Sequence, residues 1–212
     1  MSFAISTPQK AEIAFKHAEQ LKESSRYEEA LLEFQDIGKE FPYSKYAKIS
    51  KLKVADVHFD MASYIQAQYQ YQYYFDLYPK EANSDYALYR VGLSMYKLLP
   101  KTVDRDLTGT TGVLKAWRNL LVKFPKSKFT PEILKYQKKL LKDLGEKELY
   151  IANFYLKKKK YVSAQRRINK LFKEFPSFEK NKKALATALA CAKGLGDEPA
   201  IRKYSDLLKK AN

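Results

Sequence analysis

The chain has 212 residues, and its 40 Lys and Arg against 24 Asp and Glu give a net charge of +16. Its single cysteine, Cys191, excludes an internal disulfide and disfavours a cysteine-based metal site, and we expect a buried structural thiol there. No apolar run approaches a membrane span, and the first residues lack a secretory signal, so the protein is either cytosolic or has lost its signal.

The first expected helix pair ends at a proline. The segment Tyr27–Pro42, YEEALLEFQDIGKEFP, carries Ala30, Phe34 and Ile37 on one helical face and stops at an aromatic residue followed by Pro42. Proline cannot extend a helix, because it lacks an N–H group and clashes with the preceding turn. One such helix cannot bury its own apolar stripe, so it needs neighbours.

The same spacing recurs before three later prolines, Pro79, Pro125 and Pro176. Counted back from each of the four prolines, positions 12, 8, 5 and 1 hold Ala30, Ala67, Val113 and Ala164; Phe34, Tyr71, Trp117 and Ile168; Ile37, Tyr74, Leu120 and Leu171; and Phe41, Tyr78, Phe124 and Phe175. A fifth copy, Ala200, Tyr204 and Leu207, reaches the chain end before its proline.

A preceding helix carries a small residue in each repeat, at Ala18, Ala55, Gly92, Ala152 and Ala188. Small residues let two helix backbones approach, and helix pairs of this length that end in proline are typical of tetratricopeptide repeats. The sequence therefore predicts an all-α fold, a right-handed superhelical solenoid of about five tetratricopeptide-like helix pairs.

Two places depart from the repeat. About nine extra residues, around LLPKTVDRDL, separate the helices of the third pair, and 14 extra residues precede Ala152. Thr130 is a good N-cap with Pro131 at the first helical position, and no later proline interrupts. We predict one long helix over Pro131–Lys158, with Gly145 as its weak point.

Catalytic chemistry has little support in the sequence. The two histidines, His17 and His58, lie on neighbouring first helices and are interpreted as ordinary polar positions. TGTTG, at Thr108–Gly112, lacks the Lys-Ser or Lys-Thr of a phosphate loop and is interpreted as a loop entering a helix. We expect no enzyme activity, no cofactor and no metal site.

Charge divides the chain into two halves. Residues 1–100 hold 12 basic and 13 acidic side chains, whereas residues 101–212 hold 28 and 11. Such a basic field attracts nucleic acid, anionic lipid or an acidic protein surface. Within a single domain, 1–212, we expect a peptide groove in residues 1–98 and a basic partner dock in residues 99–212. The 17 tyrosines would suit an extended polypeptide or single-stranded nucleic acid equally well.

Several segments give the chain a family resemblance. RYEEALLEFQDIGKEFPYSKYA, YALYRVGLSMY, VDRD at Val103–Asp106, FPKSKF and the long helix leading into KELYIANFYLKKKKYVSAQRRINKLFKEFP resemble the BamD (ComL-like) family of outer-membrane assembly lipoproteins over nearly the whole length. The resemblance implies a non-enzymatic, periplasmic, lipid-anchored scaffold and substrate receptor that helps BamA fold and insert β-barrel proteins. The family's signal peptide and acylated cysteine do not stand in this sequence, and we interpret Met1 as added to a trimmed chain.

The resemblance also implies contact residues. Phe41 and Tyr155 stand at steps near the family's substrate-contacting surfaces, and we expect them to contact unfolded outer-membrane β-barrel proteins. Arg167 lies one residue, or about 100°, from the packed Ile168 and would offer its guanidinium to the last POTRA domain of BamA. Other Bam lipoproteins are further expected partners, and nucleic acid is not.

Two other functions stay open on the sequence alone. One is a different tetratricopeptide adaptor, either a cell-envelope coordinator or a cytosolic peptide-binding scaffold. The other is a single-stranded nucleic-acid binder.

Overall fold

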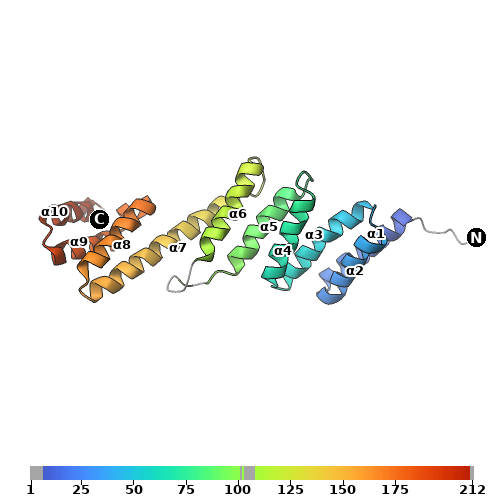
Figure 1. Ribbon diagram of the computed structural model, residues 1–212, viewed down its shortest axis with the longest axis horizontal. Helices are drawn as coiled ribbons and strands as arrows, with labels where there is room; N and C mark the ends of the chain where they lie inside the picture. The colour runs from blue at the N-terminus through green and yellow to red at the C-terminus, as the bar shows by residue number, and fades with distance from the viewer. Residues whose placement is uncertain (1–6, 101, 103–107, 211–212) are drawn as a thin grey trace, which may run out of the picture. The chain divides into compact units, whose positions relative to one another are not determined.

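The computed structural model describes residues 7–100, 102 and 108–210, and all regular structure in these residues is helical (Figure 1). The elements are α1 (Thr7–Glu23), α2 (Tyr27–Glu40), α3 (Lys45–Asp60), α4 (Tyr64–Leu77), α5 (Ser84–Lys97), α6 (Gly109–Lys123), α7 (Thr130–Lys157), α8 (Tyr161–Glu174), the 3-10 helix η1 (Pro176–Lys180), α9 (Lys182–Leu195) and α10 (Glu198–Lys210). The predicted all-α fold of helix pairs is confirmed.

The helices fall into two compact units. The first holds α1 to α6 and the first turn of α7 up to Ile133, and from α1 to α6 each helix packs on the next along the chain. The second holds the rest of α7 with α8, η1, α9 and α10. The division of one domain at residues 98 and 99 into a groove and a dock stays a prediction.

The aromatic-proline pairs end their helices in one way. Phe41, Tyr78, Phe124 and Phe175 have φ between −126° and −132° and ψ between 54° and 74°. A following proline disfavours the helical region for the residue before it, which explains why each helix ends at this residue. Each aromatic residue still donates its backbone N–H to the carbonyl four residues earlier, which satisfies one orphan acceptor of the last turn.

The turns inside the pairs also repeat. Ser25, Ala62 and Lys159 take left-handed φ values of 56–58°, each five residues before the small residue of the second helix. Gly196 takes φ 68° in the turn from α9 to α10. A single left-handed residue reverses the chain tightly between antiparallel helices, at a cost that only glycine avoids.

Glycine lets aromatic rings pack directly against helix backbones in two places. A Cβ added at Gly92 would lie 2.2 Å from the Trp117 indole, and one at Gly145 would lie 2.3 Å from the Phe178 ring. Trp117 is fully buried and donates its indole N–H to the Tyr89 carbonyl at 3.2 Å. The third repeat therefore has glycine where the others have alanine because its second helix carries the largest side chain.

This packing makes a stability prediction. Gly92→Ala should lower the free energy of unfolding by about 1–3 kcal/mol, the usual cost of overpacking a filled core. Gly38→Ala is the matched control, since nothing lies within 4 Å of an added Cβ in α2, and better helix propensity should raise stability by up to about 1 kcal/mol. Urea unfolding measures the change in the free energy of unfolding for both variants. An unchanged stability of Gly92→Ala would contradict the steric account.

The long helix forms as predicted, with small differences. α7 runs without a break from Thr130 to Lys157, and Gly145 serves the packing of Phe178. Thr130 is the first helical residue, and its buried hydroxyl has no hydrogen-bond partner among the described residues, so it does not act as the expected N-cap. The VDRD motif at residues 103–106 lies outside the described residues.

The remaining expectations concern single residues. Cys191 is fully buried in α9 with a free thiol, and burial raises its pKa. No described helix combines the length and apolar character needed to cross a membrane. In the described ranges, His, Cys, Asp and Glu side chains form no group of three or more that could hold a metal ion.

Candidate peptide-binding site

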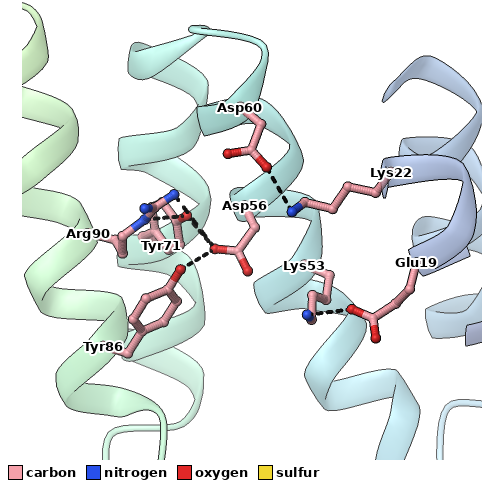
Figure 2. Close-up of polar contacts among 8 residues, drawn as sticks. All are labelled: Glu19, Lys22, Lys53, Asp56, Asp60, Tyr71, Tyr86 and Arg90. Atoms are coloured by element: carbon pink, nitrogen blue, oxygen red, sulfur yellow. Dashed lines mark hydrogen bonds and ion pairs between the residues drawn. The ribbon is translucent and has the colours of Figure 1, made fainter. Parts of the chain in front are cut away.

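A polar cluster centred on Asp56 joins three helices of the first unit (Figure 2). The Tyr71 and Tyr86 hydroxyls both donate to Asp56 Oδ1, at 2.5 and 2.7 Å. Arg90 donates from Nε to the Tyr71 hydroxyl at 2.8 Å and lies 4.0 Å from the carboxylate. Its guanidinium also rests 3.7 Å from the centre of the Phe59 ring. The cluster thus links a carboxylate from α3, a phenol from α4, and a phenol and a guanidinium from α5.

Burial determines the protonation of the two tyrosines. Burial and then the charge of Asp56 raise the pKa of Tyr71 and of Tyr86 well above the ordinary range of the phenol, so both hydroxyls remain donors. Burial alone would lower the pKa of Arg90, but the interactions with Tyr71, Tyr86 and Asp56 outweigh it and raise that pKa. The guanidinium of Arg90 therefore keeps its charge within a cluster that is mostly shielded from solvent.

An open hollow of about 550 Å³ lies beside this cluster in the first unit. Its walls come from α3, from α5 with the turn before it, and from the segment before α7: Ile49, Leu52, Lys53, Asp56, Ala82, Asn83, Asp85, Tyr86 and Lys128. Lys53 pairs with Glu19 of α1 at 2.5 Å, and Ser127 donates to Asp85 at 2.7 Å. Its lining of three apolar and six polar or charged side chains offers hydrogen-bond donors and acceptors, and the backbone of an extended polypeptide needs both.

A second hollow, of about 560 Å³, surrounds Phe41. It lies between the start of α1 and the turn from α2 to α3, and its aromatic walls are Phe41, Tyr43 and Tyr46. Tyr43 is fully exposed, at 101%, whereas Phe41 is partly buried and also packs against the core of the first repeat. Phe41 therefore has two contacts: it packs on the core at the end of the first repeat, and it lines an accessible apolar hollow.

Tyr155 belongs to the second unit, so the structure does not unite it with Phe41 in one described site. Its ring is partly buried near the end of α7, and it meets the half-exposed ring of Phe154 edge to face at 5.7 Å. The substrate contacts of Phe41 and Tyr155 stay predictions.

Arg167 has a partner within its own chain. Its Nη1 lies 3.1 Å from Oε2 of Glu148, and Lys170 Nζ lies 2.6 Å from Oε1 of the same carboxylate. Burial alone would raise the pKa of Glu148, but the hydrogen bonds from Lys170 and Arg167 outweigh it and hold that pKa below its ordinary value. The side chain of Glu148 is 12% exposed against 37% for Arg167, so the guanidinium still reaches solvent from the α7–α8 contact.

The Asp56 cluster was not predicted from the sequence. Tyr71 was expected only as a core residue, and no role was predicted for Asp56 or Arg90. A usable signal was present, since Asp56 directly follows the small residue Ala55, and Arg90 precedes the equivalent Gly92 by two. A charge beside the most closely packed position of a first helix needs a partner from a neighbouring helix.

Comparison with known proteins finds a family whose sequence model matches most of this chain. The family model YfiO, described as outer membrane lipoprotein, matches residues 8–207. Outer membrane protein assembly factors BamD are 27% identical over 84% of this chain and 70% of the relative in Neisseria gonorrhoeae, and 27% identical over 89% and 74% in Rickettsia prowazekii. The relative of the same name in Vibrio cholerae is 22% identical over 92% and 85%.

The fold has a solved counterpart. The structure titled TPR2AB-domain:pHSP90-complex of yeast Sti1 aligns with 96% of this chain and 78% of its own, with a TM-score of 0.57 and 11% identity. At this identity the likeness shows the fold alone, and it supports the tetratricopeptide-like arrangement of helix pairs.

Proposed function

The chain belongs to the YfiO family of outer membrane lipoproteins, and on that basis we propose that it is a non-enzymatic scaffold and substrate receptor of the outer-membrane β-barrel assembly machinery. The relatives named as outer membrane protein assembly factors support a role in this assembly. The native form would be held by a lipid anchor at the periplasmic face of the outer membrane. Its partners would be BamA, through the POTRA domains, other Bam lipoproteins and unfolded β-barrel proteins.

The observation that carries the receptor role is the Phe41 hollow. It is open and lined by three aromatic side chains, and Tyr43 is fully exposed among the residues that the structure describes. An exposed tyrosine beside an apolar cavity is typical of a surface that binds ligands. The hollow suits one large terminal aromatic side chain of an unfolded barrel segment, and the hollow beside Asp56 suits an extended backbone.

The proposal is tested with two peptides, one that copies the C-terminal strand of a β-barrel protein with its final Phe, and one with Ser in its place. Phe41→Ala should weaken binding of the Phe peptide at least tenfold, because an aromatic contact of this size contributes about 1.5–3 kcal/mol. Tyr43→Ala should also weaken binding of the Phe peptide. Because Tyr43 is fully exposed, this substitution removes no core contact. Tyr155→Ala should weaken it if the second unit contributes to the same substrate.

Leu32→Ala is the control, since Leu32 is 61% exposed on α2 and does not line the hollow. Circular dichroism first establishes that each variant keeps its helices. Unchanged affinity in folded Phe41→Ala and Tyr43→Ala, or equal affinity of the wild type for both peptides, would refute the receptor site.

A further inference from the structure

The turn from α7 to α8 carries four consecutive exposed lysines, Lys157–Lys160, which we call the lysine turn. The segment 149–173 around it holds eight basic side chains and no Asp or Glu. The acid just before this segment, Glu148, pairs with Arg167 and Lys170 instead. None of the four lysines forms an ion pair with a residue that the structure describes. The lysine turn therefore presents uncompensated positive charge to solvent.

The repeat does not require lysine at this turn. Lys159 takes φ 56° at the reversal between its two helices, where the other described turns of this kind have Ser25, Ala62 and Gly196. A left-handed backbone is unfavourable for any residue with a Cβ, and lysine has no advantage there over serine or alanine. The like charges of its neighbours also repel one another. An external anionic partner would offset this repulsion.

Acidic groups of the neighbouring helices do not neutralise the lysine turn. The end of α9 packs against the start of α8, since a Cβ added at Gly194 would lie 2.3 Å from the Tyr161 ring. The turn after α9 carries Asp197 and Glu198, but Asp197 accepts a hydrogen bond from a backbone N–H of α10 at 3.1 Å. Within the part of the chain that the structure describes, neither carboxylate pairs with the lysine turn. Lys193, in the last turn of α9, adds a further positive charge.

The chemistry of the lysine turn favours a fluid anionic surface over a fixed carboxylate. Its backbone N–H groups from Lys158 to Lys160 already donate to carbonyls of α7, at 3.2, 2.9 and 3.0 Å, so none of them remains to orient a bound anion. Lysine offers a point charge on a flexible stem, whereas the planar fork of arginine matches a fixed carboxylate. Phe154 and Val162 border the turn on its two sides and are 52% and 57% exposed. Exposed apolar groups beside lysines are typical of protein surfaces that lie in the headgroup layer of a membrane.

We propose that the lysine turn rests on a membrane surface that contains anionic phospholipids. The ammonium groups lie at the lipid phosphates, and Phe154 and Val162 enter the headgroup layer. The contact depends on salt, because exposed charges are screened over about 10 Å at 0.1 M ionic strength. The inference does not rest on the proposed function, because it requires neither the hollows of the first unit nor a lipid anchor.

The probes are two kinds of vesicle, one of phosphatidylcholine alone and one of equal parts of phosphatidylcholine and phosphatidylglycerol, with binding measured by co-sedimentation at low salt. The wild type should bind the anionic vesicles and not the neutral ones. Lys157→Gln/Lys158→Gln/Lys160→Gln should weaken this binding by about tenfold to a hundredfold, because each lysine beside an anionic membrane contributes roughly fivefold in affinity. Lys159 stays in place, so the left-handed residue of the turn is unchanged.

Lys180→Gln/Lys182→Gln/Lys183→Gln is the matched control. It removes three exposed lysines of the same unit and changes the net charge equally, but at the opposite end of α9. That helix is about 20 Å long, so its far end lies beyond the screening distance and the loss should be less than about threefold. Circular dichroism establishes that both variants keep their helices. Equal losses in the two variants, or a wild type that binds neither vesicle, would overturn the inference.

An acidic polypeptide is the alternative partner, and polyglutamate tests it. Phe154→Ala/Val162→Ala should weaken binding to the anionic vesicles about threefold or more, because only the membrane buries these apolar side chains, and should leave polyglutamate binding unchanged. If this variant binds vesicles as the wild type does, the apolar contact is absent and the membrane proposal is wrong. It is equally wrong if polyglutamate displaces the protein from the vesicles at a lower concentration of charge than the lipid provides.

Discussion

Asp56→Asn is expected to lower the free energy of unfolding by about 2–3 kcal/mol. The carboxylate accepts hydrogen bonds from Tyr71 and Tyr86 and faces Arg90, and both charged side chains are at most 16% exposed. Removing one charge of a buried pair strands the other, at a cost of about 3–5 kcal/mol when burial is complete. The remaining exposure and the hydrogen bonds that an amide can still accept reduce the expected loss.

Asp60→Asn on the same helix is the matched control (Figure 2). Asp60 pairs with Lys22 at 2.8 Å, but their side chains are 33% and 26% exposed, and exposed ion pairs contribute at most about 1 kcal/mol. Urea unfolding should therefore show a larger loss of stability for Asp56→Asn than for Asp60→Asn, although the two aspartates lie one helical turn apart. Equal small losses in both variants would mean that the Asp56 cluster contributes no more than a surface ion pair.

The helix pairs were predictable because their signals are local. Proline after an aromatic residue disfavours a helical conformation at Phe41 through local sterics, and small residues at fixed spacing indicate where helices cross. The same columns located the long α7, since 14 extra residues without proline have to form helix or loop. The left-handed turn at Lys159 carried no such signal, because lysine has no preference for that conformation.

The sites were less predictable because they depend on which helices meet. The column of Tyr71 predicts a core residue, and the residue is fully buried. Its hydroxyl also links Asp56 to Arg90, which belongs to the next repeat. Arg167 was placed at the edge of its packed face, where the structure has it. Its neighbour Glu148 lies in the long helix α7. The repeat columns align α7 with α8 only at Ala152, so they do not predict which residue of α7 faces Arg167.

That neighbour changes how the partner contact of Arg167 has to be tested. Arg167→Glu places a second carboxylate against Glu148, so it should cost about 2 kcal/mol of stability as well as binding. If Arg167 also contacts a POTRA carboxylate, the free energy of binding to isolated POTRA domains should weaken by about 2–5 kcal/mol. Lys158→Glu, on the exposed lysine run after α7, should mainly change the association rate and the salt dependence.

Acid titration isolates the internal pair. Because the pKa of Glu148 is lowered in the folded protein, its stabilisation is present above the unfolded pKa of about 4.3 and is lost as pH falls through the folded value. Glu148→Gln should therefore be less stable than wild type at neutral pH and approach it in acid. A constant difference at every pH would mean that packing, not charge, explains the loss.

The charge swap Glu148→Lys/Arg167→Glu separates fold from binding. It restores opposite charges between positions 148 and 167 and leaves the net charge unchanged, but the new lysine at position 148 faces Lys170, so only part of the stability lost in Arg167→Glu should return. The partner would nevertheless meet a carboxylate where it had met a guanidinium, in a geometry that lysine cannot reproduce. Weak binding in a variant that regains stability would assign the contact to Arg167 itself. Recovery of POTRA affinity together with stability would show that Arg167 acts only by holding Glu148, and that diffuse basic charge attracts the partner.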